Sequence, residues 1–329
     1  MRNLYPTLAV LLVLGAAAPA VDRAPAGVTV TDPEHNAQVL LDQADTTFQS
    51  RDYPAAFAEY RRAADLAREE FNRSVEVEAL AQMARMKLIL GEAEEAQRWL
   101  EQAASRVDES DPMGYSRYLG VKGRFEWKAG DLGTARETFE KMYTFCDVNA
   151  LWGRAVDAAH MIGIVAETPE EQIKWGRQGI EAAEAADVER WLGPLYNNLA
   201  ITYYEQKQYD SALANFIKAR EYHWRHSDEI GKLFADYHVG MTYRHLGDFE
   251  EAGKWLRPVL AWAERLGHHG AIGQACEELG EIAHAQGDRG EALKLLRRAR
   301  SEYKAEGYDE SWPDIWDNIN KRLDELQQP

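Results

Sequence analysis

The fold is decided by a pattern that is clearest in residues 209–219, YDSALANFIKA. An alanine, here termed the marker alanine, is followed four positions later by a large apolar residue and seven positions later by a small one. The pattern recurs at Ala56/Tyr60/Ala63, Ala96/Leu100/Ala103, Ala135/Phe139/Met142, Ala212/Phe216/Ala219, Ala252/Leu256/Val259 and Ala292/Leu296/Ala299. A degenerate copy at Gln172/Gly176/Gly179 makes the successive spacings 40, 39, 37, 40, 40 and 40 residues. This fixed period predicts an architecture of stacked repeats.

Each repeat is predicted to be two helices joined by a tight turn. Twelve positions before the marker lies a second small residue, which lets the two helices approach closely: Ala44, Ala84, Gly123, Ala200, Gly240 and Gly280. We expect the marker alanine to be its counterpart on the following helix. Turn signals follow at 51–53, 91–93, 130–132, 247–249 and 287–289, mostly with glycine, which readily ends a helix in a left-handed conformation. In the fourth repeat, Thr168-Pro169-Glu170-Glu171 predicts a capped helix start.

These positions resemble a known family. Tyr196, Leu199-Ala200, Tyr203, Ala212, Phe216 and Ala219 resemble the tetratricopeptide repeat, and Leu279-Gly280, Gly287-Asp288, Ala292 and Ala299 match it again. The resemblance covers roughly residues 36–305. The period is longer than the usual 34 residues and is similar to the longer-helix repeats of kinesin light chains. The resemblance implies an all-α fold: a right-handed α-α superhelical solenoid of about seven helix pairs, with a C-terminal capping helix over 306–329.

The two ends of the chain lie outside the repeats. Arg2, an apolar run over 8–14 and the Ala18-Pro19-Ala20 site predict a signal peptide over 1–20, with an uncleaved anchor as the alternative. Residues 21–35 are expected to be a linker. At the C-terminal end, Ser311-Trp312-Pro313-Asp314 predicts a capped helix start, and Trp312, Trp316, Ile319, Leu323 and Leu326 are expected to cover repeat seven. We expect a soluble periplasmic or secreted protein forming one continuous solenoid, with no membrane span after cleavage.

Charge and cysteine content exclude several classes of protein. The 329 residues carry a net charge of −17, with 55 acidic and 38 basic residues, so nucleic acid is not an expected partner. The two cysteines cannot form a disulfide framework. Export favours buried thiols. We place Cys276 on the first helix of repeat seven and Cys146 just after the second helix of repeat three, too far apart to bond.

The sequence shows no catalytic motif of a known class. A P-loop, a His-Glu-x-x-His pair and a Gly-x-Ser-x-Gly elbow are all absent. His223, His226, His238 and His245 lie in adjacent repeats, where imidazoles can share a metal. No carboxylate or thiolate accompanies them at metal-ligand spacing, so exposed or hydrogen-bonded helix histidines are the favoured interpretation. We therefore predict no metal, no cofactor and no enzymatic activity.

The resemblance implies that the first helices line a concave groove, with partner-binding residues at fixed offsets before the marker. On this sequence those positions are Arg85, Arg117, Arg124, Trp127, Asn197, Tyr204, Tyr237, Met241, Arg244, Glu277, Glu281 and His284. Arginines come first, aromatic residues and methionine follow, and carboxylates come last. A peptide with an acidic end, an apolar middle and a basic end would complement this order. Solvated or internally paired side chains are the alternative. The Lys and Asn carboxylate clamp of co-chaperones is not reproduced at these positions.

Three functions follow from these features, in order of preference. The first is an exported, non-enzymatic scaffold or adaptor that binds a protein or peptide in the groove. The second is a receptor in which a ligand changes the superhelix pitch. Gly176 and Gly179 would be its hinge, because Gly lowers helix stability by about 1 kcal/mol relative to Ala. The third is an enzyme with an unrecognised site. The oligomeric state is left open.

Overall fold

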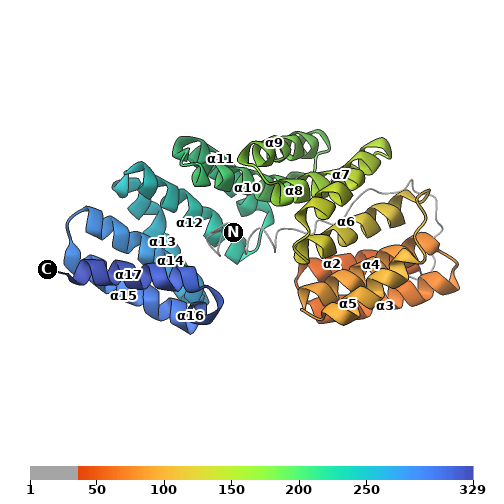
Figure 1. The fold of residues 1–329 in the computed structure, drawn as a ribbon, viewed down its shortest axis with the longest axis horizontal. Helices are drawn as coiled ribbons and strands as arrows, with labels where there is room; N and C mark the ends of the chain where they lie inside the picture. Colours follow the sequence, from red (N-terminus) through yellow and green to blue (C-terminus); the bar gives the residue numbers. More distant parts are fainter. Residues whose placement is uncertain (1–35, 329) are drawn as a thin grey trace. The chain divides into compact units, whose positions relative to one another are not determined.

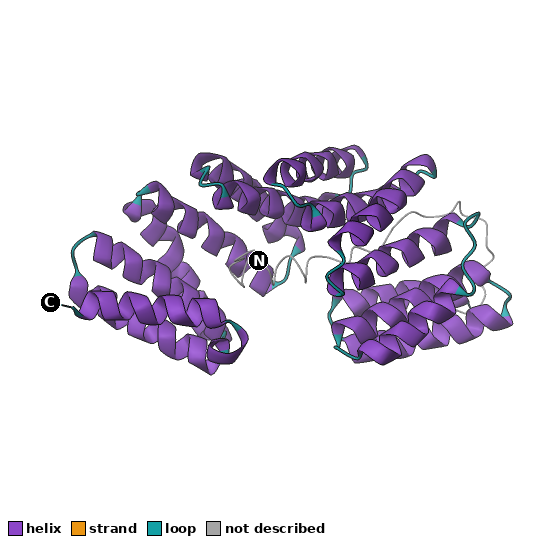
Figure 2. Cartoon of the chain, in the orientation of Figure 1, coloured by secondary structure: helices purple, strands orange, loops and turns teal. Residues whose placement is uncertain are grey.

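The computed structural model describes residues 36–328, and every element within them is helical. The helices follow one another as consecutive packed pairs (Figures 1 and 2). Within the described residues they group into two compact units, 36–191 and 192–328, here termed the N-terminal and C-terminal units. The predicted signal peptide and linker lie outside the described residues. Among those described, no helix is long and apolar enough to cross a membrane.

The N-terminal unit holds four helix pairs. They are α2 (Ala37–Gln49) with α3 (Tyr53–Glu69), α4 (Arg73–Ile89) with α5 (Ala93–Ala104), α6 (Pro112–Lys128) with α7 (Leu132–Val148), and α8 (Trp152–Val165) with α9 (Pro169–Ala185). A short 3-10 turn, η2 (Glu189–Trp191), closes the unit. The predicted hinge glycines Gly176 and Gly179 lie inside α9, which is continuous.

The C-terminal unit holds three further pairs and the cap. They are α10 (Leu192–Glu205) with α11 (Tyr209–His226), α12 (Glu229–Leu246) with α13 (Phe249–Leu266), and α14 (His269–Ala285) with α15 (Arg289–Ala305). The cap consists of α16 (Tyr308–Ser311) and α17 (Pro313–Gln327). The all-α arrangement of seven helix pairs with a C-terminal helix is therefore confirmed. The continuity of one solenoid through both units stays a prediction.

The turns inside the pairs have the predicted chemistry. Four glycines lie in the left-handed region, with φ between 79° and 85°: Gly91, Gly130, Gly247 and Gly287. Asp131, Asp248 and Asp288 follow three of these glycines, and Asp52 follows Arg51, which is also left-handed; each carboxylate accepts the backbone N–H three residues on and caps the second helix. In the fourth repeat the Thr168 hydroxyl accepts the N–H of Glu171, as predicted. Each pair is thus closed by local sequence alone.

The marker alanines form the centre of each pair. Ala56, Ala96, Ala135, Ala212, Ala252 and Ala292 are all fully buried. The closest side chain to the facing glycine, however, is the large residue four positions on. A methyl group on Gly123 would lie 2.6 Å from the Phe139 ring, and Gly280 faces Leu296 in the same way at 2.9 Å. The small residue therefore accommodates the large apolar side chain of the next helix more than it does the alanine.

This close approach predicts opposite outcomes for two Gly→Ala substitutions in the N-terminal unit. Gly123→Ala should destabilise by about 1–2 kcal/mol, because overpacking against Phe139 costs about 1–3 kcal/mol while helix propensity returns at most about 1 kcal/mol. Gly163→Ala meets only Trp175, at an ordinary 3.9 Å, and should stabilise by up to about 1 kcal/mol. Urea-unfolding midpoints measure both. Equal shifts of the same sign would contradict this account of the packing.

The C-terminal cap covers the last repeat as predicted, with one change. Ile319, Leu323 and Leu326 are buried, while Trp312 and Trp316 are partly buried. The α17 N-cap is Trp312, which makes no side-chain capping hydrogen bond, so the expected polar cap is wrong. Ser311 ends α16 instead, because that extra turn occupies the residues before Pro313.

Neither cysteine forms a disulfide, and both are buried, as predicted. Cys276 lies on α14, the first helix of repeat seven. Cys146 lies within the last turn of α7 and not after it, because that helix continues to Val148. Burial raises the pKa of the Cys276 thiol to about 11, so this group is protonated and unreactive at neutral pH.

Candidate functional site

The twelve predicted partner-binding residues all lie on first helices of their pairs. In the N-terminal unit, α4 carries Arg85, and α6 carries Arg117, Arg124 and Trp127. In the C-terminal unit, α10 carries Asn197 and Tyr204, α12 carries Tyr237, Met241 and Arg244, and α14 carries Glu277, Glu281 and His284. Their contacts within each unit show which side chains are already engaged. Their role in binding a partner stays a prediction.

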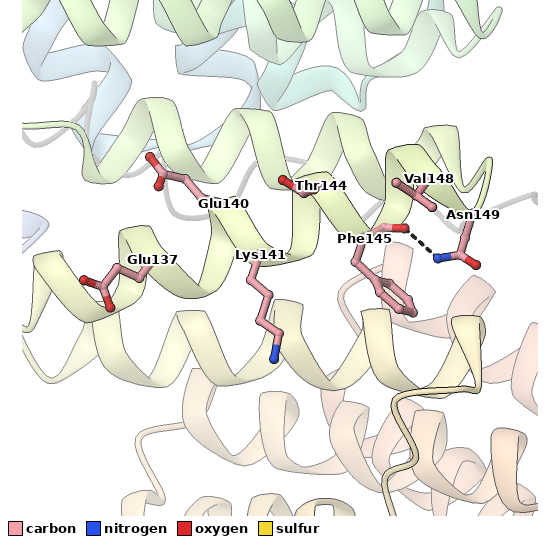
Figure 3. Close-up of a pocket in the computed structure, with 7 residues that line it drawn as sticks. All are labelled: Glu137, Glu140, Lys141, Thr144, Phe145, Val148 and Asn149. Carbon is pink, nitrogen blue, oxygen red and sulfur yellow. Dashed lines mark hydrogen bonds between the residues drawn. The ribbon is translucent and has the colours of Figure 1, made fainter.

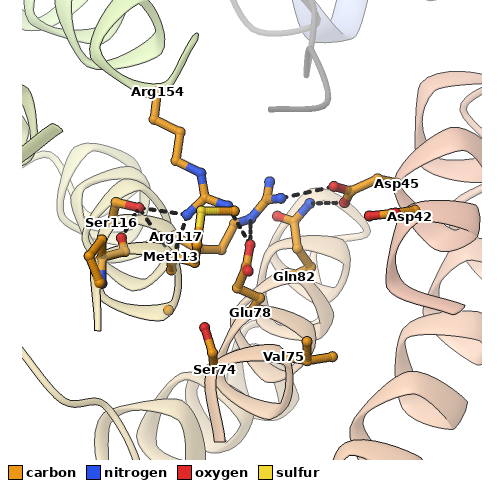
Figure 4. Close-up of polar contacts among 12 residues, drawn as sticks. Asp42, Asp45, Ser74, Val75, Glu78, Gln82, Met113, Ser116, Arg117 and Arg154 are labelled. Atoms are coloured by element: carbon orange, nitrogen blue, oxygen red, sulfur yellow. Dashed lines mark hydrogen bonds and ion pairs between the residues drawn. The ribbon is translucent and has the colours of Figure 1, made fainter. Parts of the chain in front are cut away.

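Arg117 joins two buried carboxylates inside the N-terminal unit (Figure 4). Its Nη2 donates to Oδ2 of Asp45 on α2 at 2.8 Å, and its Nε donates to Oε2 of Glu78 on α4 at 3.2 Å. Both carboxylates are more than nine-tenths buried. Arg117 therefore connects three successive first helices. The alternative of an internally paired side chain is the one observed here.

Arg154, on α8, extends this network to a fourth first helix and was not among the predicted residues. One Nη group pairs with Glu78, and the other donates to the Ser116 hydroxyl at 2.6 Å and to the Met113 carbonyl. Arg154 is only 5% exposed. Its Nε is buried and donates to no acceptor within residues 36–328. The network thus provides acceptors for both Nη groups of Arg154 but not for its Nε.

Asp45 is held in its charged form. Tyr60 donates its hydroxyl to Oδ1 of Asp45 at 2.5 Å, and Gln82 donates its amide to the same oxygen at 3.3 Å. Burial raises the pKa of Asp45, but Arg117 and these two hydrogen bonds outweigh burial and keep the pKa below its ordinary value. At neutral pH the network therefore contains a carboxylate, not a carboxylic acid.

The other two predicted arginines lie on the same side of the unit. Arg124 donates to Oδ1 of Asp157 at 2.6 Å and to the Gly120 carbonyl at 2.8 Å. The guanidinium of Arg85 lies over the Phe48 ring at 4.9 Å. Burial lowers the pKa of Arg85 to about 9, and repulsion from Arg124 adds to this shift. Arg124 is thus paired with the Asp157 carboxylate, while Arg85 makes a cation–π contact with Phe48.

These arginines surround a small polar cavity of about 30 Å³. Its charged and aromatic lining consists of Arg85, Arg117, Arg124, Arg154, Asp157 and Trp191. Four guanidinium groups and one carboxylate therefore line a space large enough for two or three water molecules. Sequence reasoning predicted the three arginines of α4 and α6 but did not predict that they converge.

Arg244 is paired in the C-terminal unit. It forms an ion pair with Glu278, and the hydroxyl of Tyr237 lies 3.5 Å from Oε1 of the same carboxylate. The Nη2 of Arg244 also lies 2.7 Å from Nε2 of His245. Because a guanidinium only donates, this imidazole nitrogen accepts. Burial, with Arg244 beside it, lowers the pKa of His245 to about 4.

The predicted carboxylates also have partners. Tyr303 donates its hydroxyl to Glu277 at 2.5 Å, yet burial raises the pKa of Glu277 to about 7. Glu281 accepts two hydrogen bonds from Arg322 of the capping helix, at 2.6 and 2.8 Å. The carboxylates expected at the acidic end of the groove are thus engaged by α15 and α17, and Arg322 of α17 supplies a counter-charge to Glu281. His284 is partly exposed.

The residues expected to form the apolar middle of the groove are largely buried. Asn197, Tyr204, Tyr237 and Met241 are each less than 9% exposed. Tyr204 packs edge-on against the His245 ring at 5.0 Å, which places it inside the unit. Trp127, in the other unit, is partly buried against the core around Phe139. A binding partner would therefore contact little of the surface of Asn197, Tyr204, Tyr237 and Met241.

The histidines weighed for metal binding do not form a ligand set. Within the described residues, no group of three or more His, Cys, Asp or Glu is placed to hold a metal ion. The ring of His223 hydrogen-bonds the Ser227 hydroxyl at 2.7 Å. His238 is fully buried, stacks on Phe216 at 4.9 Å and leaves both ring nitrogens without a partner. The interpretation of exposed or hydrogen-bonded histidines is therefore wrong for His238.

A second hollow lies on a second helix. It has a volume of about 680 Å³ and runs along α7 (Figure 3). Glu137, Glu140, Lys141, Thr144, Phe145, Val148 and Asn149 line it. Phe145 packs edge-on against Tyr115 at 4.9 Å, while Val148 is 79% exposed. This surface mixes acidic and apolar groups, and none of its residues was predicted, because the search was confined to first helices.

Three segments match family models for the tetratricopeptide repeat: residues 77–102, 195–223 and 233–305. They coincide with α4–α5, α10–α11 and α12–α15. The helix pairs in these segments are therefore tetratricopeptide repeats, and the chain is a member of that superfamily. No curated protein sequence matches the chain.

Solved structures with a similar fold are distant in sequence. A Signal Transduction ATPase with Numerous Domains (STAND) protein with a tetratricopeptide repeat sensor, from Pyrococcus horikoshii, is 17% identical with a TM-score of 0.68. The match covers 89% of this chain but only 44% of that protein. The apo form of RapI is 13% identical, with 82% and 77% coverage and a TM-score of 0.66. A Rap protein complexed with Competence and Sporulation Factor is 14% identical, with 88% and 87% coverage and a TM-score of 0.57.

Proposed function

We propose that this chain is an exported, non-enzymatic protein-interaction scaffold that holds a peptide or protein segment along the first helices of its repeats. Tetratricopeptide repeats stack in one dimension, so each adds one strip to a shared binding surface. A Rap protein of the same fold is complexed with Competence and Sporulation Factor. We extend such binding to this chain as part of the proposal.

One observation carries the proposal. Asp45, Glu78, Arg117 and Arg154 come from α2, α4, α6 and α8, yet they form one connected network. Four successive first helices therefore present their side chains to one shared side of the N-terminal unit. A segment lying along that side would contact one repeat after another. Of these four side chains only Arg117 is partly exposed and offers charge to a partner, and Trp127 on the same helix offers an aromatic contact.

Affinity capture with two single variants distinguishes the two faces of the N-terminal unit. Trp127→Ala alters the first-helix side, and Val148→Lys adds a charge to the α7 hollow. We expect the wild type and Val148→Lys to capture the same partner from the native compartment, and Trp127→Ala to capture at least tenfold less. Thermal unfolding of each variant confirms that both remain folded.

The reverse result would move the binding surface to the second helices. Capture by both variants at the wild-type level would argue against the N-terminal unit as the binding unit. The same mass spectra also test export. If the signal peptide is removed, the N-terminal peptide of the captured bait begins at Val21, whereas a retained anchor leaves residues 1–20 in place.

A further inference from the structure

The guanidinium of Arg85 lies beside the arginine-lined cavity and is hydrogen-bonded to no carboxylate within residues 36–328. Its ring contact with Phe48 supplies no counter-charge that could neutralise it. Within residues 36–328, no hydrogen bond or ion pair joins Arg85 to a carboxylate, although Arg117, Arg124 and Arg154 each have one. An arginine out of bulk water is ordinarily retained with a partner. Asp157 attracts Arg85 electrostatically, but this carboxylate is hydrogen-bonded to Arg124, so Arg85 is free to bind a further anion.

The arginines that line the cavity outnumber the carboxylates paired with them by one. Four arginines line it, and the carboxylates that pair with them are Asp45, Glu78 and Asp157. Asp42 also lies near Arg117, but it is exposed, accepts from Gln38 and forms no ion pair with the lining arginines, so it is not counted among their partners. Four cations against three anions give a local charge of +1. This surplus lies in a chain whose total charge is −17.

A second, independent feature points to the same missing group. The Nε of Arg154 is a buried donor without an acceptor among the described residues, and Arg154 lines the same cavity as Arg85. A buried N–H without an acceptor costs about 1–3 kcal/mol and is rare in folded proteins. One acceptor that carries a negative charge would serve both arginines.

The size of the cavity limits what that acceptor is. A space of about 30 Å³ holds two or three atoms of water size and does not hold a peptide backbone. We propose that the N-terminal unit binds one compact monovalent anion between Arg85 and Arg154, either a halide ion or a single carboxylate group. This site goes beyond the proposed function, because it is complete within residues 36–191 and does not require a peptide partner.

Calorimetric titration of the full chain tests the site directly. The buffer contains only a bulky sulfonate anion, and the probes are sodium chloride, sodium formate and sodium methanesulfonate. We expect saturable binding of one chloride or one formate per chain, with only a non-saturating ionic-strength response to methanesulfonate. Binding of formate but not chloride would assign the site to carboxylates, and the reverse would assign it to a free halide.

Two substitutions tie the binding to Arg85. Arg85→Met keeps the contact with Phe48 but removes the charge, and it should weaken anion binding at least tenfold, while Arg85→Lys keeps part of it. Arg62→Met, on the exposed side of α3, is the matched control and should bind as the wild type does. In the anion-poor buffer Arg85→Met should unfold at a higher temperature than the wild type, because a partly buried charge without a hydrogen-bonded counter-ion is lost. Chloride should remove that difference.

The proposal is overturned if the wild type shows no saturable binding of either compact anion. It is also overturned if Arg85→Met binds as tightly as the wild type. Neither result would bear on the peptide-binding proposal, because no partner protein is present in these titrations.

Discussion

Glu78→Gln is expected to destabilise the N-terminal unit by about 3–5 kcal/mol, the cost of removing one member of a buried ion pair. The Glu78 carboxylate is 1% exposed and accepts from both Arg117 and Arg154. Arg117 would keep Asp45 as a partner, but Arg154 would lose the only carboxylate that it contacts among the described residues. Urea unfolding followed by circular dichroism measures the loss.

Two further variants separate this effect from charge removal in general. Glu92 pairs with Lys87 at 2.7 Å on the surface, so Glu92→Gln should cost less than about 1 kcal/mol. Replacing both partners of the buried pair, as in Glu78→Gln with Arg154→Met, should recover part of the lost stability, because no unpaired buried charge remains. Equal losses for Glu78→Gln and Glu92→Gln would show that the buried network does not stabilise the unit.

His238 is expected to cost the C-terminal unit about 2.5 kcal/mol of stability when the pH falls from 7 to 4.5. Burial lowers the pKa of His238 to about 3, and His223 beside it adds repulsion. The unfolded chain titrates near pH 6.5, so between pH 6.5 and 3 the unfolded state binds a proton that the folded state does not. The stabilisation is therefore complete above pH 6.5 and is lost as the pH falls.

Hydrogen exchange of peptides from α11 and α12 measures this loss within the unit itself. His238→Met fills the site with an apolar side chain of similar size and should reduce the loss between pH 7 and 4.5 by about 2.5 kcal/mol, the share that His238 contributes. His284→Met, at a partly exposed position on α14, is the control and should leave the dependence as in the wild type. The burial argument fails if His238→Met shows the same loss at pH 4.5. His223 and His245, whose pKa values burial lowers to about 4, add losses of similar size in the same direction. Glu277 opposes them, because burial raises its pKa to about 7 and the folded state then binds the proton first.

The repeat architecture could be predicted because it depends on local sequence. A marker alanine, a large apolar residue four positions on and a turn glycine or a capping residue recur every 40 residues or so, and each element acts within one helix pair. The buried alanines, left-handed glycines and capping aspartates all follow from this period. Only details failed, such as the Trp312 N-cap, because helix ends depend on neighbouring turns.

The partners of the predicted arginines could not be found in the same way. Arg117 pairs with Asp45 across 72 positions, and Arg154 pairs with Glu78 across 76. A family offset selects one position per helix and does not show which charges on neighbouring helices meet. One signal was available, since Glu78 and Arg117 are 39 residues apart, about one repeat. Opposite charges separated by one or two periods are candidates for contact between stacked first helices.

The sequence by itself determined the helix pairs, their number, their turns and the chemical types on the first helices, because these depend on contacts within about 40 residues. Only the tertiary structure decided which charged side chains are paired with one another inside the protein. It showed that Tyr237 and Met241 are packed away, that Asp45, Glu78 and Asp157 neutralise three arginines, and that Arg85 remains unpaired beside a cavity. The physical reason is that a charge is stabilised by the groups around it in space, and packing brings those groups from several different repeats.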